Sequence, residues 1–249
     1  MKIVSTSAAF IFGGSSPIAI SLSLYLQKKH QVIHFTRDTK QDCFKELLDC
    51  GVILEELDFM DIDLGSLQYE RLSELMISHN PEHLVFAQRS REVVFTKFLQ
   101  IDINAVHQIC ELFTSCNNST TKTALIFTSP AAKFVQSTQA VGYHVGKAAQ
   151  VQMARFYAAN FRKYGMRINC LAPGAFVEKE RSKNFYLENI DLTNRIKKII
   201  PMGRFVTIQR IVDVADFLLS EKSNFINGQE IYLDGGISLL DQSMFTSEY

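Results

Sequence analysis

Two residues suited to proton transfer lie four positions apart in the second half of the chain. Tyr143 and Lys147 occur in the segment YHVGK, at the start of a stretch with helical spacing. Side chains four positions apart on a helix lie on one face. A cation beside a phenol favours the phenolate form, so the pair suits general acid/base chemistry. The same spacing is also common in ordinary surface contacts, and the surrounding residues must decide between the two interpretations.

Three further features accompany the Tyr143–Lys147 pair. Ser129 follows the apolar segment 124–128, Asn104 lies within the preceding helical stretch, and Pro173-Gly174 ends the next apolar segment. In open parallel sheets, ligands bind beyond the carboxyl ends of the strands. We therefore expect Ser129 to lie near the Tyr143–Lys147 pair.

A glycine-rich turn follows the first apolar segment, residues 8–12. The turn reads Gly-Gly-Ser-Ser-Pro from Gly13 to Pro17. Its backbone N–H groups and the following helix N-terminus could bind a phosphate. Ser16 suits the N-cap position and Pro17 the first helical position. The alternative is an ordinary strand-to-helix turn, because such turns are often glycine-rich.

The second apolar segment ends in Thr36-Arg37. In a dinucleotide-binding sheet, this position sets the preference for one ribose over another. An acidic residue there would hold a 2′-hydroxyl group, whereas an arginine suits a 2′-phosphate. The alternative is a solvated surface arginine.

These residues require strands and helices that alternate along the chain. Strands that are apolar throughout are typical of a parallel sheet covered on both faces, with right-handed helical crossovers. The sequence therefore predicts an α/β fold, a Rossmann-like doubly wound parallel sheet in one domain, residues 1–249. The expected strands are 8–12, 31–36, 52–57, 84–87, 124–128, 167–172 and 229–233, and the expected helices are 17–29, 40–50, 64–78, 93–115, 142–163 and 208–220.

Composition excludes several classes of protein. The 249 residues include 26 Lys plus Arg and 26 Asp plus Glu, so the formal net charge is zero. A general nucleic-acid binder needs a basic excess to displace counterions from phosphates. No apolar run reaches the roughly 18 residues of a membrane helix, and the N-terminus does not resemble a signal peptide.

Cysteines and histidines give no sign of a disulfide or metal site. The five cysteines form no CxxC pair, so we expect free thiols in a reducing compartment and a cytoplasmic location. His79 and His83 are four positions apart, but Pro81 between them disfavours a shared helix. We therefore expect no metal.

Together these residues resemble the short-chain dehydrogenase/reductase family, from about residue 8 to residue 236. Tyr143 and Lys147 fit the family's YxxxK motif, Ser129 its catalytic serine and Asn104 its helix asparagine. The segments RIN…PG (167–174) and FINGQ…DGG (225–236) resemble a family segment and the C-terminal signature of 3-oxoacyl-thioester-reductase-like members. Each motif is ordinary alone, but their order and spacing are specific.

The resemblance implies hydride transfer between a nicotinamide cofactor and a carbonyl or secondary alcohol. Tyr143 would protonate the carbonyl oxygen in reduction and accept the hydroxyl proton in oxidation. Ser129 would hydrogen-bond the same oxygen. Lys147 would bind the nicotinamide ribose, and Asn104 would hold a water linking Lys147 to solvent.

The resemblance also implies a cofactor, NADP(H) in preference to NAD(H). Asp58 would face the adenine, and Thr36-Arg37 resembles the NADP-preferring pattern. The implied cofactor-binding residues are Gly13, Ser15, Ser16, Ile18, Arg37, Asp58, Phe86, Ala87, Tyr143, Lys147, Pro173 and Gly174.

The first half of the chain departs from the family pattern. Pro17 and Ala19 replace two glycines of the TGxxxGxG motif, and Pro17 removes one N–H group. Arg89 replaces the glycine of NNAG, and Glu178 replaces a threonine after Pro-Gly. These departures motivate an alternative hypothesis: a degenerate member that acts as a binding or regulatory protein without turnover.

The substrate and the assembly are less well specified. Residues 176–205 take the place of the family's substrate lid, in which Phe185, Tyr186 and Leu187 could close over an apolar substrate. The alternative is a solvated charged face. A 3-oxoacyl thioester, a secondary-metabolite ketone or a sugar-derived ketone would fit. The resemblance also implies a homodimer or homotetramer through helices 93–115 and 145–161, with no nucleic-acid or membrane partner.

Overall fold

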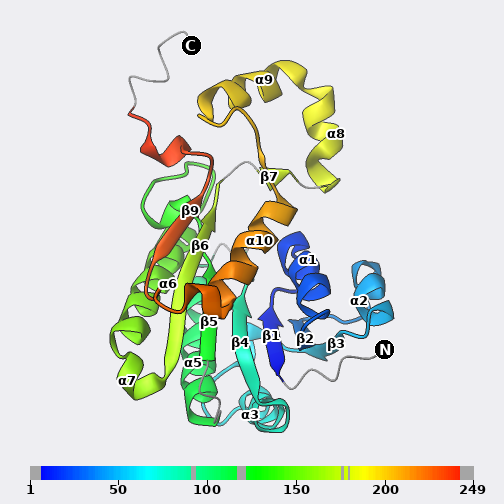
Figure 1. Cartoon of the computed structure of the whole chain (residues 1–249), viewed down its shortest axis with the longest axis vertical. Helices are drawn as coiled ribbons and strands as arrows, with labels where there is room; N and C mark the ends of the chain where they lie inside the picture. Colours follow the sequence, from blue (N-terminus) through cyan, green and yellow to red (C-terminus); the bar gives the residue numbers. More distant parts are fainter. Residues whose placement is uncertain (1–6, 91–93, 117–121, 175–176, 179, 242–249) are drawn as a thin grey trace.

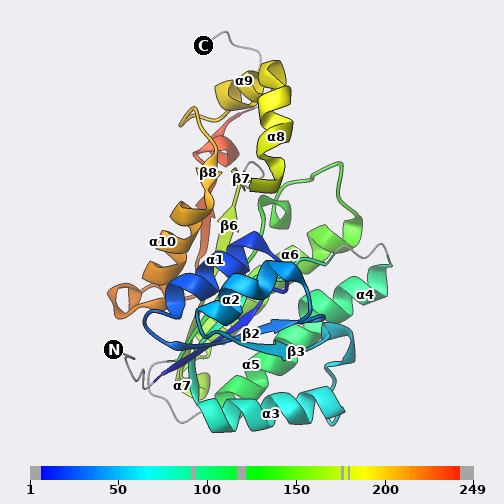
Figure 2. The same ribbon diagram turned by 90° about the vertical axis from the view of Figure 1, so that its right-hand side faces the viewer.

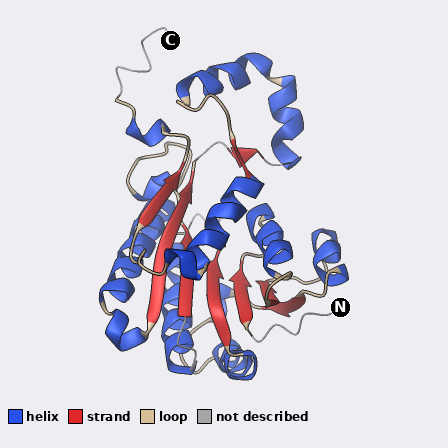
Figure 3. Ribbon diagram, viewed as in Figure 1, coloured by secondary structure: helices blue, strands red, loops and turns tan. Residues whose placement is uncertain are grey.

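Seven parallel strands form the central sheet, in the order β3-β2-β1-β4-β5-β6-β9 (Figures 1 and 3). The computed structural model describes residues 7–90, 94–116, 122–174, 177–178 and 180–241. An order that grows outwards from β1 is that of a doubly wound, Rossmann-like sheet, which confirms the predicted fold. The strands are β1 (Ala8–Phe12), β2 (Gln31–Thr36), β3 (Ile53–Glu56), β4 (Pro81–Phe86), β5 (Lys122–Phe127), β6 (Met166–Pro173) and β9 (Glu230–Leu233).

Helices cover both faces of the sheet (Figures 1 and 2). Phe10 and Phe12 of β1 belong to one apolar core, whereas Ala9 and Ile11 belong to the other. Successive side chains of a strand point to opposite faces, so a strand with two cores is apolar throughout. One face carries α1 (Pro17–Leu26), α2 (Lys45–Asp49) and α10 (Ile208–Leu219), and the other carries α3 (Leu67–His79), α5 (Ala105–Cys116) and α6 (Val141–Ala159).

Local sequence sets several element boundaries. Helix α1 begins at Pro17 with Ser16 as its N-cap residue, as predicted. Helix α3 ends at Asn80, which adopts a left-handed conformation with φ of 43°. Asn tolerates this region, and Pro81 cannot continue the helix. His79 therefore ends α3 while His83 lies on β4.

Two predicted helices are interrupted. The stretch predicted as helix 93–115 contains α4 (Phe95–Leu99), the π-helical turn η3 (Gln100–Asn104) and α5, with residue 93 outside the described residues. The stretch 142–163 breaks at Asn160 into α6 and α7 (Phe161–Tyr164). Shorter turns are η1 (Asp42–Phe44), η2 (Phe59–Asp61), η4 (Pro130–Ala132), η5 (Glu221–Ser223) and η6 (Ile237–Leu239).

A small helical unit lies beyond the carboxyl ends of the strands (Figures 1 and 2). It contains α8 (Glu180–Glu188) and α9 (Ile190–Ile199), and it joins the rest through β7 (Val177–Glu178), which pairs with β8 (Val206–Thr207). This unit occupies most of the predicted lid, residues 176–205. Among the described residues, no helix combines the length and apolar character needed to cross a bilayer.

Candidate active site

Tyr143 and Lys147 lie on one face of α6, as their spacing predicts. The Lys147 Nζ atom is 5.9 Å from the centre of the Tyr143 ring. Lys147 is 2% exposed and Tyr143 is 8% exposed. The phenol therefore borders a buried positive charge.

Three groups hold the Lys147 ammonium. Nζ donates to the Phe127 carbonyl oxygen at 3.2 Å and to Gln150 Oε1 at 3.0 Å. It also lies 3.8 Å from Asp102 Oδ1, and both side chains of this ion pair are almost fully buried. These contacts position the ammonium at the carboxyl end of β5.

Asp102 reaches Lys147 from the π-helical turn η3. Gln150 Nε2 donates to the Asp102 backbone oxygen at 3.0 Å and to its Oδ1 at 3.3 Å. Burial raises the pKa of the Asp102 carboxyl, although Lys147 and Gln150 oppose the rise. A Cβ at Gly146 would lie 3.0 Å from the Asp102 Cβ, so glycine allows the two elements to approach closely.

Asn104 lies on the same π-helical turn but points elsewhere. Its Nδ2 donates to Asp63 Oδ1 at 2.8 Å and to Gln100 Oε1 at 2.9 Å. The described contacts of Lys147 involve Asp102 and Gln150, so the structure does not bring the Asn104 side chain to the lysine. Its role through a water stays a prediction.

Ser129 begins the short turn η4 directly after β5. Its Oγ accepts a hydrogen bond from the Ala131 N–H at 3.2 Å. Ala131 and Tyr143 belong to one small apolar cluster, so the serine's turn packs against the tyrosine. The structure therefore gathers Ser129, Tyr143 and Lys147 at one end of the sheet.

Arg89 follows β4 and covers the Tyr143 ring from a second direction. Its Cζ atom is 5.5 Å from the ring centre. Its Nη2 donates to Gln139 Oε1 at 3.1 Å, just before α6. The long cation that replaces the family's glycine therefore lies beside the tyrosine.

The glycine-rich phosphate turn, residues 13–17, is hydrogen-bonded to the end of β2. The Gly14 N–H donates to the Phe35 oxygen at 3.1 Å, and the buried His34 Nε2 lies 2.9 Å from the Gly14 oxygen. A Cβ at Gly13 would overlap the Cβ of Ala19. The methyl of Ala19 is thus accommodated because residue 13 is glycine, and the strand and helix can approach closely.

Several other predicted cofactor contacts have clear positions. Arg37 is exposed after β2, and Asp58 Oδ1 accepts from the Met60 N–H at 3.0 Å. Phe86 points into the core, where its ring stacks on Phe12 at 5.2 Å, so only its backbone lies at the strand end. Ala87 follows it, and its N–H bonds the Phe12 oxygen.

The Pro173-Gly174 segment ends β6 against the end of β9. A Cβ at Gly174 would lie 2.9 Å from the Asp234 Cβ, and the Gly174 N–H donates to Leu233 O at 3.0 Å. Glycine therefore permits a close packing of two strand ends. Glu178 of β7 is exposed.

The carboxyl edge of the sheet fits a dinucleotide. Ile18 and Ala19 lie in the first turn of α1, where N–H groups have no intrahelical acceptor and can bind phosphate. Two buried polar groups, the Gln88 amide and the Thr128 hydroxyl, have no hydrogen-bond partner among the described residues. Buried polar groups usually have a hydrogen-bond partner, so these two suit a polar ligand at the ends of β4 and β5.

A model of known sequences, described as enoyl-(acyl carrier protein) reductase, matches residues 80–238 of the chain. This segment contains Asn104, Ser129, Tyr143 and Lys147 and extends over most of the chain. The chain belongs to the short-chain dehydrogenase/reductase family. The observed fold agrees with this family assignment.

Curated relatives of this short-chain dehydrogenase/reductase have diverse names. An A-factor type gamma-butyrolactone 1′-reductase of Streptomyces virginiae is 28% identical over 47% of this chain and 45% of its own length. A 3-oxoacyl-[acyl-carrier-protein] reductase of Chlamydia trachomatis is 25% identical over 60% of this chain and 59% of its own length. Both matches span less than two thirds of the relative.

Solved structures show the same fold over nearly the whole chain. A short-chain dehydrogenase/reductase from Serratia marcescens covers 94% of this chain and 99% of its own, with 18% identity and a TM-score of 0.75. A gluconate 5-dehydrogenase from Burkholderia cenocepacia, in complex with NADP and tartrate, covers 96% of this chain and 97% of its own. Its identity is 17% and its TM-score 0.77. At these identities, the likeness concerns the fold alone.

Sequence reasoning missed Asp102 and Gln150 in this short-chain dehydrogenase/reductase. Asp102 was visible only as a neighbour of Asn104, and Gln150 lies three positions after Lys147. Gln150 is a polar residue at a buried position of α6, and buried polar side chains usually have hydrogen-bond partners. This is the signal that could have pointed to its role.

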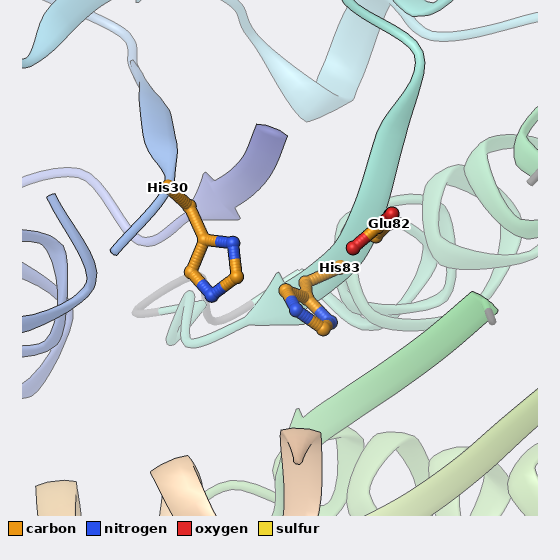
Figure 4. Close-up of side chains that lie close together, drawn as sticks. All are labelled: His30, Glu82 and His83. Carbon is orange, nitrogen blue, oxygen red and sulfur yellow. The ribbon is translucent and has the colours of Figure 1, made fainter. Parts of the chain in front are cut away.

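A second cluster of polar side chains lies at the opposite, amino edge of the sheet (Figure 4). His30, Glu82 and His83 bring possible ligand atoms within 4.8 Å of one another. Hydroxyls already bond both rings: Ser7 Oγ lies 2.7 Å from His30 Nδ1, and Thr123 Oγ1 lies 2.6 Å from His83 Nδ1. We interpret the cluster as a packing contact between neutral rings.

Proposed function

We propose that this chain is an NADP(H)-dependent oxidoreductase that interconverts a carbonyl and a secondary alcohol, with Tyr143 as general acid/base. The carrying observation is the Tyr143 ring beside the buried Lys147 ammonium, 5.9 Å away, on one face of α6. The turn that begins at Ser129 packs against the same tyrosine. A phenol, a buried cation and a hydroxyl together suit proton transfer to an oxygen.

The chain's own residues donate and accept the proton. A bound nicotinamide cofactor supplies the hydride for reduction and accepts it in oxidation. In reduction, Tyr143 passes its hydroxyl proton to the carbonyl oxygen, which becomes the alcohol oxygen. In oxidation, Tyr143 accepts that proton again. The Ser129 oxygen accepts from the Ala131 N–H, so its own hydrogen is available to donate to the same substrate oxygen.

Lys147 has two roles in this proposal. Its ammonium would hold the nicotinamide ribose hydroxyls, and its charge stabilises the Tyr143 phenolate. Asp102 and Gln150 are positioning residues, since they bind Lys147 and each other. Asn104 would act through a water, as the family resemblance implies.

The preference for NADP(H) rests on Arg37. This exposed side chain follows β2, beside the phosphate turn, where a guanidinium suits a 2′-phosphate. The gluconate 5-dehydrogenase of similar fold is in complex with NADP. Among substrates, we favour a 3-oxoacyl thioester or a secondary-metabolite ketone, which the C-terminal signature and the names of the relatives support.

The test is NADPH oxidation with a panel of ketones and oxoacyl thioesters. Tyr143→Phe removes the proton donor, so we expect the rate to fall by about 10²- to 10⁴-fold. Tyr164→Phe is the matched control, because Tyr164 lies on α7 and its hydroxyl bonds Lys163. Equal rates for the wild type and Tyr143→Phe would show that the assigned acid is wrong.

A degenerate binding or regulatory protein is the second candidate. It is favoured by Pro17 at the first helical position, which removes one N–H from the phosphate turn. Calorimetric titration with NADPH and NADH separates the two candidates. Tight binding of either favours the enzyme, whereas no binding at millimolar cofactor would overturn it.

We further propose a homodimer or homotetramer and a cytoplasmic location. Val141, Val145 and Phe156 expose apolar side chains on α6, which supports an assembly through this helix. Cys43 and Cys50 are free thiols at the surface, which supports a reducing compartment.

A further inference from the structure

The site contains two cations of different character. Lys147 Nζ and Arg89 Cζ lie 5.9 Å and 5.5 Å from the centre of the Tyr143 ring. Lys147 is buried and paired with Asp102, so its charge is compensated within the protein. Arg89 is exposed. The two cations therefore have different needs for a counter-charge.

Among the described residues, no acidic side chain forms an ion pair with the Arg89 guanidinium. Within the described part of the chain, its side-chain hydrogen bond goes to the neutral amide of Gln139. A guanidinium carries five N–H donors, so this single bond leaves most of them available. Gln139 thus orients the group without neutralising it.

Arg89 lies beside the residue that we propose as the proton donor, with its Cζ atom 5.5 Å from the centre of the Tyr143 ring. A guanidinium over an aromatic ring is held by cation–π attraction while its edge stays open to a ligand. The ring in question belongs to Tyr143, the proposed proton donor. A substrate whose carbonyl oxygen meets the Tyr143 hydroxyl therefore lies close to the Arg89 fork, which matches a carboxylate or phosphate.

We propose that Arg89 is a specificity residue that binds an oxyanion, a carboxylate or phosphate, carried by the substrate near its reacting carbon. The substrate class is then an anionic ketone or the corresponding hydroxy anion, which narrows the proposed ketones to anionic ones and disfavours a 3-oxoacyl thioester. This inference rests on the proposed function, because it assumes that the carbonyl oxygen meets Tyr143. The cofactor's diphosphate is another source of the same chemistry, and the experiment separates the two.

The experiment compares matched anionic and neutral substrates. The pairs are acetoacetate with methyl acetoacetate, and dihydroxyacetone phosphate with dihydroxyacetone, each with NADPH. We expect the wild type to favour one or both anions. In Arg89→Gln, the ratio of kcat/KM for the favoured anion to that for its neutral partner should fall roughly 10- to 100-fold. Arg89→Lys keeps the charge but loses the fork, so its ratio should be intermediate.

Arg210→Gln is the control for the loss of one exposed arginine. Arg210 lies on α10 and pairs with Asp213, so its removal should leave the ratio unchanged. An unchanged ratio in Arg89→Gln, or a wild type without preference for either anion, would overturn the proposal. A matching loss of NADPH affinity in the binary complex would assign the oxyanion to the cofactor and overturn it as well.

A binding measurement keeps the inference separate from the proposed function. Acetoacetate and dihydroxyacetone phosphate are titrated calorimetrically into wild type and Arg89→Gln with NADP⁺ present. Binding by the wild type that weakens at least about 10-fold in the variant supports the oxyanion site even without turnover. Absent or equal binding overturns it, whereas absent turnover with intact binding overturns only the proposed function.

Discussion

Lys147 is stabilised in the interior by a carboxylate that the proposed chemistry does not itself require. An isolated buried ammonium is costly, and removing one partner of a buried ion pair typically costs about 3–5 kcal/mol. Asp102 meets this need, and Gln150 bonds both members of the pair. Removing the Asp102 carboxylate should therefore destabilise the folded chain.

Asp102→Asn keeps the shape of the side chain and removes its charge. The variant leaves the buried Lys147 ammonium without its ion pair, so the free energy of unfolding should fall by about 3–5 kcal/mol. The measurement is urea unfolding of the wild type and the variant at pH 7.

Gln150→Leu provides the comparison, because it removes hydrogen bonds to Lys147 and Asp102 without changing charge. It should lower the free energy of unfolding by less than Asp102→Asn does, because the ion pair remains. Equal stability of Asp102→Asn and the wild type would show that this carboxylate does not stabilise the buried ammonium.

At the scale of single residues, the sequence predicts the positions of some site side chains and misses others. The Tyr143–Lys147 pair could be predicted because residues four positions apart share one face of a regular α-helix, and α6 is such a helix. Asp102 and Asn104 lie instead on a π-helical turn. Such a turn inserts a residue and rotates the faces of the helix, so ordinary helical spacing does not show which residue meets α6. The contact from Asp102 was missed for this reason.

At the scale of elements, the carboxyl ends of β1 and β2 form one unit. His34 of β2 bonds the Gly14 oxygen and the Ser23 hydroxyl of α1, so the strand fixes both the turn and the helix. Arg37 follows the same strand. The phosphate turn and the proposed 2′-phosphate contact are therefore positioned by one element.

Arg37→Ala tests that arrangement. The variant loses the fork that would bind the 2′-phosphate, so its affinity for NADPH should fall roughly 10- to 100-fold. Affinity for NADH should change little, because NADH lacks this phosphate. Dissociation constants for both cofactors provide the internal comparison. Equal losses would show that Arg37 does not distinguish the two.

Helices and strands could be predicted where the apolar residues followed one clear pattern along the sequence. The interior strands β1, β2, β4, β5 and β6 were located because each carries apolar side chains on both faces. The helices α8 and α9 were not, since their segment is charged and α9 has no buried residue. Without a buried stripe, helical periodicity gives a weak signal. The break at Asn160 was missed because the apolar residues continue beyond it.

For the whole molecule, buried histidines link stability to pH. Burial, with His30 and Arg167 nearby, lowers the pKa of His83 to about 3, and burial also lowers the pKa of His30 and His34. Between pH 6.5, the ordinary value, and about 3, the unfolded chain binds a proton at His83 that the folded chain does not. Stability should therefore fall as the pH falls through this window.

Urea unfolding between pH 7 and pH 5 measures this loss. Each such histidine contributes a slope of up to about 1.4 kcal/mol per pH unit. His83→Gln should reduce the slope, because the unfolded chain then binds one proton fewer. His79→Gln is the matched control, because this half-buried side chain ends α3 four positions earlier. The same slope in His83→Gln and wild type would contradict the assignment.

The strand order also bears on how the chain is made. Strand β6 is long and largely apolar, and one of its sides is covered by β9, which is synthesised later than β6. Until Glu230–Leu233 has been synthesised, the open side of β6 can pair with a strand of another chain. Once in place, β9 replaces that long edge with a short, half-buried one that contains Glu230. Strand β9 should thus limit aggregation during biosynthesis.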